Sequence, residues 1–247
     1  MPCLITPHQL TSPTAHRSFS SSIPSDRLSW LIKHRTTLGL STLAVIPLAF
    51  AFFRLTWLAE TPLTSSLDAK TRTFIAEPLP LVLHVTSAPL FSGLGALLFS
   101  SPLLAKRPDL HRLIGKAVAI SGLVAALSGL WLTLSLHAAD PSVPARTGMR
   151  MVVGSTMLAS ILIALFAIAS RRVHAHRTWM TRAYAIGLSE STQAILLFLT
   201  FLALGELTPS MVTLMITLGW AINLSVAETH LRNHRPAPNR PRRLSAF

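Results

Sequence analysis

Apolar residues in this sequence occur in long runs that short polar segments separate. The six runs cover roughly residues 38–58, 81–100, 113–137, 149–170, 179–204 and 210–228. Each is close to the length of about 20 residues that a helix needs to cross the hydrocarbon core of a bilayer. The pattern therefore predicts an all-α fold, an integral membrane bundle of six transmembrane helices that lies in a lipid bilayer.

Composition supports a membrane protein and narrows its partners. Of the 247 residues, 50% are hydrophobic and 13% are charged, whereas a soluble domain has about 25% charged residues. The net charge of +13 does not indicate nucleic acid, because the basic residues form short clusters between apolar runs rather than one basic domain. A single cysteine, Cys3, excludes a disulfide framework and a cysteine-ligated zinc site, and no metal site is expected.

The basic residues also predict an orientation. Four segments hold 16 of the 22 Lys and Arg residues, namely 1–37, 101–112, 171–182 and 229–247. The segments on the other side hold Lys70, Arg72 and Arg146. Since cytoplasmic loops of membrane proteins are rich in Lys and Arg, we expect a protein of the cell (inner) membrane with both termini in the cytoplasm.

The two ends of the chain differ in composition from the runs between them. Residues 1–36 are rich in Ser, Thr, Pro, His and Arg, which predicts a disordered basic tail, with a targeting segment as the alternative. Residues 229–247 hold five Arg and three Pro and predict a second disordered basic tail near anionic headgroups. The transmembrane domain is then 37–228.

The third run carries glycines seven residues apart, at Gly115, Gly122 and Gly129. On a helix they lie within about 40° of one another. Such a ridge of small residues lets the backbone of a neighbouring helix approach closely, so we expect tight packing along it.

The fifth run is unusual because one of its faces is polar. Arg182, Ser189, Gln193 and Thr200 lie within about 20° of a single line along the helix, so this face should turn into the bundle. Glu190 lies about 80° from that line and close to the middle of the bilayer. An ionisable residue at this depth is a candidate functional group, although a neutral glutamic acid that bonds neighbouring helices together is an equal alternative.

Other polar side chains gather near the predicted cytoplasmic ends of the runs: His111, Lys116, His176, Arg182 and Asn223. If they face one another, they form a basic pocket open to the cytoplasm, suited to an anionic headgroup or an amphiphile with an acidic end. Alternatively, each reaches the interface separately or caps a helix end. With three further polar residues of the predicted spans added, the candidate ligand-binding residues are His84, His111, Lys116, His176, Arg182, Glu190, Gln193 and Asn223.

Histidines near both membrane surfaces raise the alternative of a haem protein. His111 and His137 are 26 residues apart, about 39 Å along one helix, and this exceeds a hydrocarbon core of about 30 Å. Two haems between these levels are disfavoured, but one haem b between His111 and His176, or a site that uses His84, remains open. A third possibility is a membrane-embedded enzyme acting on a lipid-like substrate, with Glu190 as proton donor and His111 or His176 as base.

Four segments of the sequence resemble a bacterial family of predicted membrane proteins, the domain of unknown function twenty-three-oh-six. They are LPLVLHVTSAP (79–89), PDLHRLIGKA (108–117), HRTWMTRAYAIGLSESTQ (176–193) and GWAINLSVAE (219–228). The resemblance implies a helical membrane bundle with recurring polar positions at His84, His111, Arg112, His176, Arg177, Arg182, Gln193 and Asn223. It implies a small residue where this chain has Glu190, and it does not include His137. The resemblance names no reaction. From the basic residues near the cytoplasmic ends of the runs, we expect a multi-pass protein that binds or moves a small amphiphilic or anionic molecule.

Overall fold

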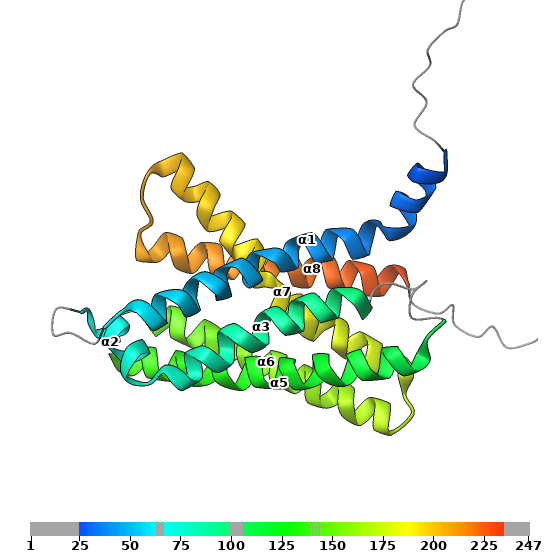
Figure 1. Ribbon diagram of the computed structural model, residues 1–247, viewed down its shortest axis with the longest axis horizontal. Coiled ribbons are helices and arrows are strands. Elements are labelled where there is room, and N and C mark those ends of the chain that lie inside the picture. The colour runs from blue at the N-terminus through cyan, green and yellow to red at the C-terminus, as the bar shows by residue number, and fades with distance from the viewer. Residues whose placement is uncertain (1–24, 63–66, 99–105, 140, 143, 235–247) are drawn as a thin grey trace, which may run out of the picture. The chain divides into compact units, whose positions relative to one another are not determined.

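A computed structural model describes residues 25–62, 67–98, 106–139, 141–142 and 144–234 (Figure 1). Within these residues the chain forms only helices: α1 (Ser25–Glu60), α2 (Ala69–Ala76), α3 (Pro78–Leu98), α5 (Pro108–Ala139), α6 (Pro144–Ala169), α7 (Val173–Leu204) and α8 (Pro209–Asn233). Six of them contain stretches long and apolar enough to cross a membrane, the first being Leu38–Glu60 of α1. The predicted all-helical membrane fold with six spans is confirmed.

The contacts divide the chain into two units, up to Arg35 and from Thr36 onward. The described part of the first unit is the beginning of α1, so residues 25–36 are helical where the sequence predicted a tail. At the other end, α8 continues to Asn233. The predicted disorder of residues 1–24 and 235–247 lies outside the described residues. The packing described below belongs to the second unit.

Proline and glycine mark the helix ends. Four helices begin with proline, which fits the first turn because the missing N–H has no partner there. Helix α7 ends at Gly205, whose φ of 75° is readily adopted only by glycine. Helix α2 is capped by the carboxylate of Asp68, which accepts the Thr71 N–H at 3.2 Å. Hydrogen bonds from the side chain and the backbone of Thr71 lower the pKa of Asp68.

Helices adjacent in the sequence pack against one another: α3 on α5, α5 on α6, α6 on α7, and α7 on α8 (Figure 1). Phe91 of α3, 1% exposed, lies at the centre. A Cβ atom at Gly122 of α5 or at Gly187 of α7 would come within 2.6 Å of its ring. The absence of side chains at both positions therefore lets α5 and α7 close on this ring from two sides. Two members of the predicted glycine ridge, Gly122 and Gly129, do face α3, whereas no atom of another described element lies within 4 Å of a Cβ position at Gly115.

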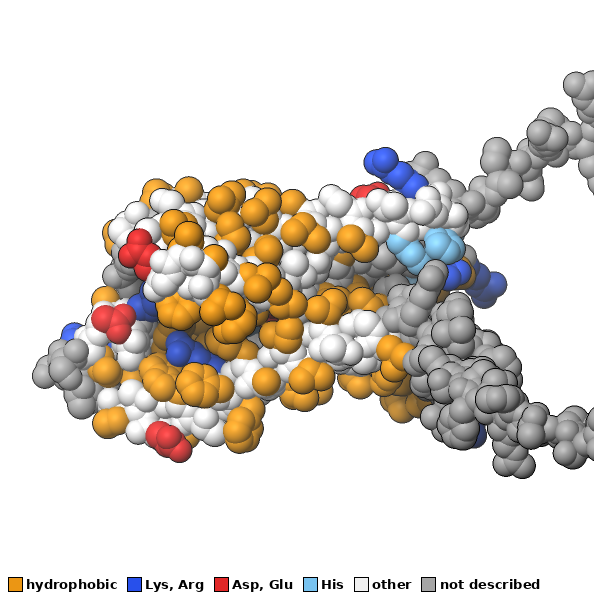
Figure 2. Space-filling view, turned by 90° about the horizontal axis from the view of Figure 1, so that it is seen from above, with side chains coloured by type: hydrophobic (Ala, Val, Ile, Leu, Met, Phe, Trp, Pro, Cys, Tyr) orange, Lys and Arg blue, Asp and Glu red, His pale blue; other side chains and the backbone are white. Residues whose placement is uncertain are grey.

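Because the spans alternate in direction, the loops divide between two ends of the bundle. We call the end with residues 61–62, 67–68, 141–142 and 205–208 the acidic-loop end. The end with residues 106–107 and 170–172 and the C-terminus of α8 is the basic-loop end. In Figure 2, most of the visible acidic side chains lie towards the first of these ends, on the left, and the visible histidine side chains lie towards the second.

Candidate functional site

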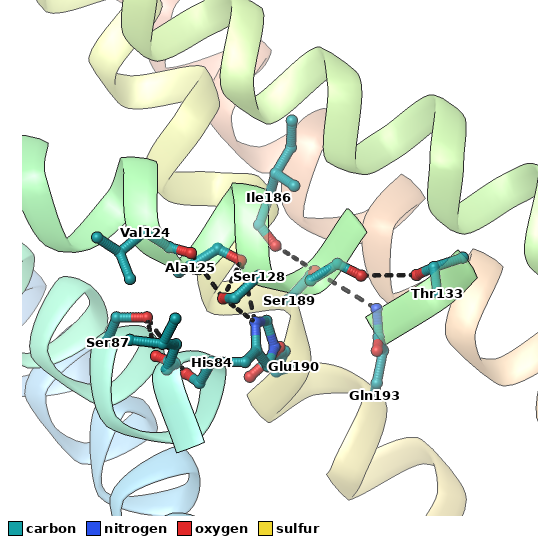
Figure 3. Close-up of polar contacts among 12 residues, drawn as sticks. His84, Ser87, Val124, Ala125, Ser128, Thr133, Ile186, Ser189, Glu190 and Gln193 are labelled. Atoms are coloured by element: carbon teal, nitrogen blue, oxygen red, sulfur yellow. Dashed lines mark hydrogen bonds and ion pairs between the residues drawn. The ribbon is translucent and has the colours of Figure 1, made fainter. Parts of the chain in front are cut away.

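A histidine and a glutamate from different helices meet in the middle part of the bundle. His84 lies in the second turn of α3, and its Nε2 atom is 3.2 Å from Oε1 of Glu190 on α7. The other ring nitrogen, Nδ1, is 3.0 Å from the backbone carbonyl of Ala125 on α5. The imidazole ring thus bridges three helices, as Figure 3 shows.

The contacts of His84 define where the protons are. A carbonyl oxygen only accepts, so Nδ1 carries a hydrogen and donates it to Ala125. In a neutral ring with that tautomer, Nε2 is an acceptor, and it would face a carboxylate that is also an acceptor. The contact with Glu190 therefore needs one proton between the two groups. The pair is either a histidine cation with a carboxylate or a neutral histidine with a protonated Glu190.

Residues of α5 pack against the ring of His84. The hydroxyl of Ser128 donates to the Val124 carbonyl at 2.6 Å and lies 3.4 Å from Nδ1 of His84. A Cβ atom at Gly129 would lie 3.1 Å from the ring, which is closer than carbon atoms pack comfortably. Gly129 therefore provides the space for the ring between α3 and α5.

Glu190 lies near the middle of its helix. It follows Val173 by 17 residues and precedes Leu204 by 14, or roughly 25 Å and 21 Å of helix. Its side chain is 45% exposed and that of His84 is 25% exposed. The predicted polar face of α7 is enclosed more fully: Ser189 is completely buried, and Gln193 contacts both Ser189 and Gly219 of α8.

Arg150 adds a cation to this region from α6. It lies close enough to Glu190 to attract the carboxylate, and close enough to His84 to repel a charged imidazole. Arg146, one turn earlier, repels Arg150. The sequence analysis did not single out Arg150. The available signal was weak, because Arg150 is the second residue of the fourth apolar run, where a charged side chain is expected to reach the interface.

A cavity of about 220 Å³ opens at the acidic-loop end above these residues. Its lining residues are Lys70, Phe74, Thr133, Leu136, His137, Arg146, Thr147 and Arg150. Among the described residues that line it are three fixed cations and a histidine, and none of these residues is Asp or Glu. Arg146 is held in place because its guanidinium donates to the hydroxyl of Thr213 at 3.2 Å and to the carbonyl of Pro209 at 3.0 Å.

A second acid–base contact lies nearer the basic-loop end. Nε and Nη2 of Arg182 on α7 donate to the two carboxylate oxygens of Glu228 on α8, the second bond at 3.2 Å. The guanidinium also lies over the ring of Trp179, 4.7 Å from its centroid. Glu228 was not among the predicted site residues, although it ends both the sixth apolar run and the GWAINLSVAE segment.

The other residues predicted to line a cytoplasmic pocket are His111, Lys116, His176 and Asn223. Nδ1 of His176 lies 2.9 Å from the Ala164 carbonyl. The side chain of Asn223 donates to the Ala185 carbonyl and accepts from Thr192. His111 and Lys116 are exposed on α5. Among the described residues, no hydrogen bond or ion pair joins any two of the side chains of His111, Lys116, His176, Arg182 and Asn223.

In the described part of the chain, no three His, Cys, Asp or Glu side chains form a group suited to a metal ion. The Nδ1 contact of His176 leaves Nε2 as the atom that would bind a haem iron, whereas both ring nitrogens of His84 have protein partners. A haem between His111 and His176 stays a prediction, and a Soret band in protein purified from haem-replete cells tests it.

The sequence of this chain matches a known protein family. A family described as predicted membrane protein, DUF2306, matches residues 81–231, more than half of the chain. The chain belongs to the DUF2306 family. No curated protein and no solved structure matches this chain. The matched region of this DUF2306 protein runs from α3 to α8 and includes both acid–base pairs and Arg150, whereas Lys70 lies outside it.

Proposed function

We propose that this DUF2306 protein binds a small anionic molecule, or an amphiphile with an acidic end, in the cavity at the acidic-loop end. The observation that carries the proposal is the lining of that cavity: within the part of the chain that the structure describes, the lining includes Lys70, His137, Arg146 and Arg150 and no carboxylate. By the distribution of Lys and Arg in the loops, this end faces away from the cytoplasm. The proposal thus moves the basic site to the side opposite to the predicted pocket.

Electrostatics support an anionic occupant. The cations that line the cavity repel one another. Because the walls of the cavity have a low dielectric constant, these cations attract an anion far more strongly than they would in water. Arg146 is already oriented by two hydrogen bonds, so part of the entropic cost of ordering a guanidinium is avoided on binding. The side chains of Phe74 and Leu136 offer an apolar wall for a short hydrocarbon part.

The size of the cavity supports a small ligand. A volume of about 220 Å³ is below the range of about 300–1,000 Å³ that is typical of pockets for drug-sized molecules. A sulfonate, carboxylate or phosphate group on a short chain fits this limit.

Calorimetric titration of the full chain in a neutral detergent with butanesulfonate tests the proposal. This probe remains charged at every pH of interest. We expect Arg150→Gln to weaken binding by roughly tenfold or more, because one charge-assisted hydrogen bond of about 1.4 kcal/mol or more is lost. Arg232→Gln removes the same charge from an exposed position at the basic-loop end and should leave the affinity unchanged.

Lys116→Gln provides the competing test. If this variant loses affinity while Arg150→Gln binds normally, the cytoplasmic pocket predicted from the sequence is the site and the proposal is wrong. Repeating the titration in nanodiscs distinguishes two sources of the acidic group. Phosphatidylglycerol in the disc should compete with butanesulfonate if the natural occupant is a lipid headgroup, and should have no effect if it is a free acid.

A membrane-embedded enzyme is the second candidate, and the His84–Glu190 contact favours it. Glu190 remains the proton donor, but its neighbour is His84 rather than His111 or His176. A lipid-modifying activity found for the wild-type protein should fall in Glu190→Gln. Full activity in that variant would remove Glu190 from the chemistry.

A further inference from the structure

The proton held by the His84–Glu190 pair lies next to the cation that faces the proposed ligand. Arg150 and Thr133 both line the cavity. The hydroxyl of Thr133 donates to the carbonyl of Gly129 at 2.8 Å, and a Cβ atom at Gly129 would lie 3.1 Å from the ring of His84. The cavity therefore adjoins the pair, and the charge of Arg150 acts on both of its members. A negative ligand that approaches Arg150 therefore changes the electrostatic potential at the pair. No ion needs to pass between the two sites for this effect.

The sign of the effect follows from the charges. Before an anion binds, the positive charge of Arg150 opposes an additional proton on His84 or Glu190. A bound anion offsets that charge, and its own negative charge attracts the proton, so the proton is held more tightly. Because coupling between two sites is reciprocal, the protonated pair must in turn bind the anion more tightly.

We propose that anion binding in this cavity is linked to uptake of a proton by the His84–Glu190 pair, so that the two enter the site together. This inference rests on the function proposed above and adds the co-bound species. The proton comes from water and is retained between Nε2 and Oε1. The described geometry, in which this contact is closed, corresponds to the proton-loaded form.

The other groups around the pair limit where the proton can go. From α5, Ser128 and the Ala125 carbonyl face His84. From α6, Arg150 is the charged neighbour. On α7, Ser189 and Gln193 are polar but do not titrate near neutral pH. Elsewhere in the cavity, His137 is the titratable rival, with its Nδ1 atom 3.4 Å from the hydroxyl of Thr147.

Proton uptake is measured directly with a glass electrode. The full chain in weakly buffered neutral detergent is titrated with butanesulfonate at several pH values from about 6 to 9, a range that brackets the ordinary pKa of histidine. Alkalinisation on binding is calibrated by back-titration with acid. We expect the wild-type protein to take up a proton as it binds, and its affinity for butanesulfonate to rise as the pH falls.

Two variants assign the proton. Glu190→Gln should still bind butanesulfonate but take up close to no protons, because the carboxylate that retains the proton is gone. His137→Gln removes a residue that lines the cavity and is expected to weaken binding, but for each butanesulfonate bound it should take up as many protons as the wild type does. Binding without alkalinisation at any pH would overturn the inference, as would uptake that persists in Glu190→Gln or disappears in His137→Gln, and each leaves the proposed anion site standing. Absence of butanesulfonate binding by the wild-type protein would overturn both.

Discussion

Two acid–base pairs join helices of this bundle, and they differ in how completely their charges are satisfied. Arg182 and Glu228 form two hydrogen bonds to each other, and an arginine is charged at every accessible pH. His84 and Glu190 share a single contact that exists only with a proton between them, beside Arg150. We infer that the first pair holds α7 against α8, whereas the second can change its charge while the helices stay in place.

The largest expected effect is the loss of the Arg182–Glu228 pair. In Glu228→Gln, the neutral amide leaves the guanidinium without a counter-charge in a partly buried site. Breaking a buried ion pair costs about 3–5 kcal/mol, and because these side chains are 29% and 33% exposed, we expect about 2 kcal/mol of unfolding free energy to be lost. Unfolding in mixed micelles with increasing denaturing detergent measures it.

A double variant distinguishes loss of the pair from loss of packing. Replacing both partners, Arg182→Met with Glu228→Leu, removes the uncompensated charge and should recover most of the lost stability, because apolar pairs of similar volume often replace buried ion pairs without loss. A double variant as unstable as Glu228→Gln would contradict the view that this pair is structural.

The packing that brings His84 to Glu190 is the next most sensitive feature. A Cβ atom at Gly95 of α3 would overlap the ring of Tyr184 on α7, whose hydroxyl donates to the Ser92 carbonyl at 2.7 Å. Gly95→Ala should destabilise the protein by about 1–2 kcal/mol through overpacking, measured by the same unfolding titration. Gly93, with nothing within 4 Å of its Cβ position, is the matched control on the same helix. Gly93→Ala should be neutral or stabilise slightly, and equal loss in both variants would refute the role of the Tyr184 contact.

The smallest expected effect on stability is that of Glu190→Gln. The amide of glutamine can donate to Nε2 of a neutral His84, so the hydrogen bond is kept without the shared proton. The change in unfolding free energy should stay below about 1 kcal/mol, well under that of Glu228→Gln. A Glu190→Gln variant as unstable as Glu228→Gln would mean that both pairs are structural, and the contrast between them would be lost.

The residues of the site were only partly predictable. Glu190 and His84 both stood out in the sequence, one as an acid in an apolar run and the other in a segment resembling a known family. Their contact could not be predicted from the sequence, because the two residues are 106 positions apart. Helical periodicity gives only the angle of a side chain about its own helix. Arg150 and Glu228 were overlooked because they lie near the ends of apolar runs, where a charged side chain is expected to reach the interface.

By itself the sequence determined that the membrane spans are helices and how many there are. Runs of about 20 apolar residues are stable in few environments other than a lipid bilayer, where they form helices. It also determined that one face of the helix carrying Ser189 would be enclosed. Only the tertiary structure decided which polar groups meet. The rotation and crossing of α3, α5, α6 and α7 place His84 beside Glu190 and Arg150, and those of α7 and α8 pair Arg182 with Glu228. These arrangements depend on how glycines and aromatic rings interlock between helices, and that packing is a property of facing surfaces rather than of any one segment.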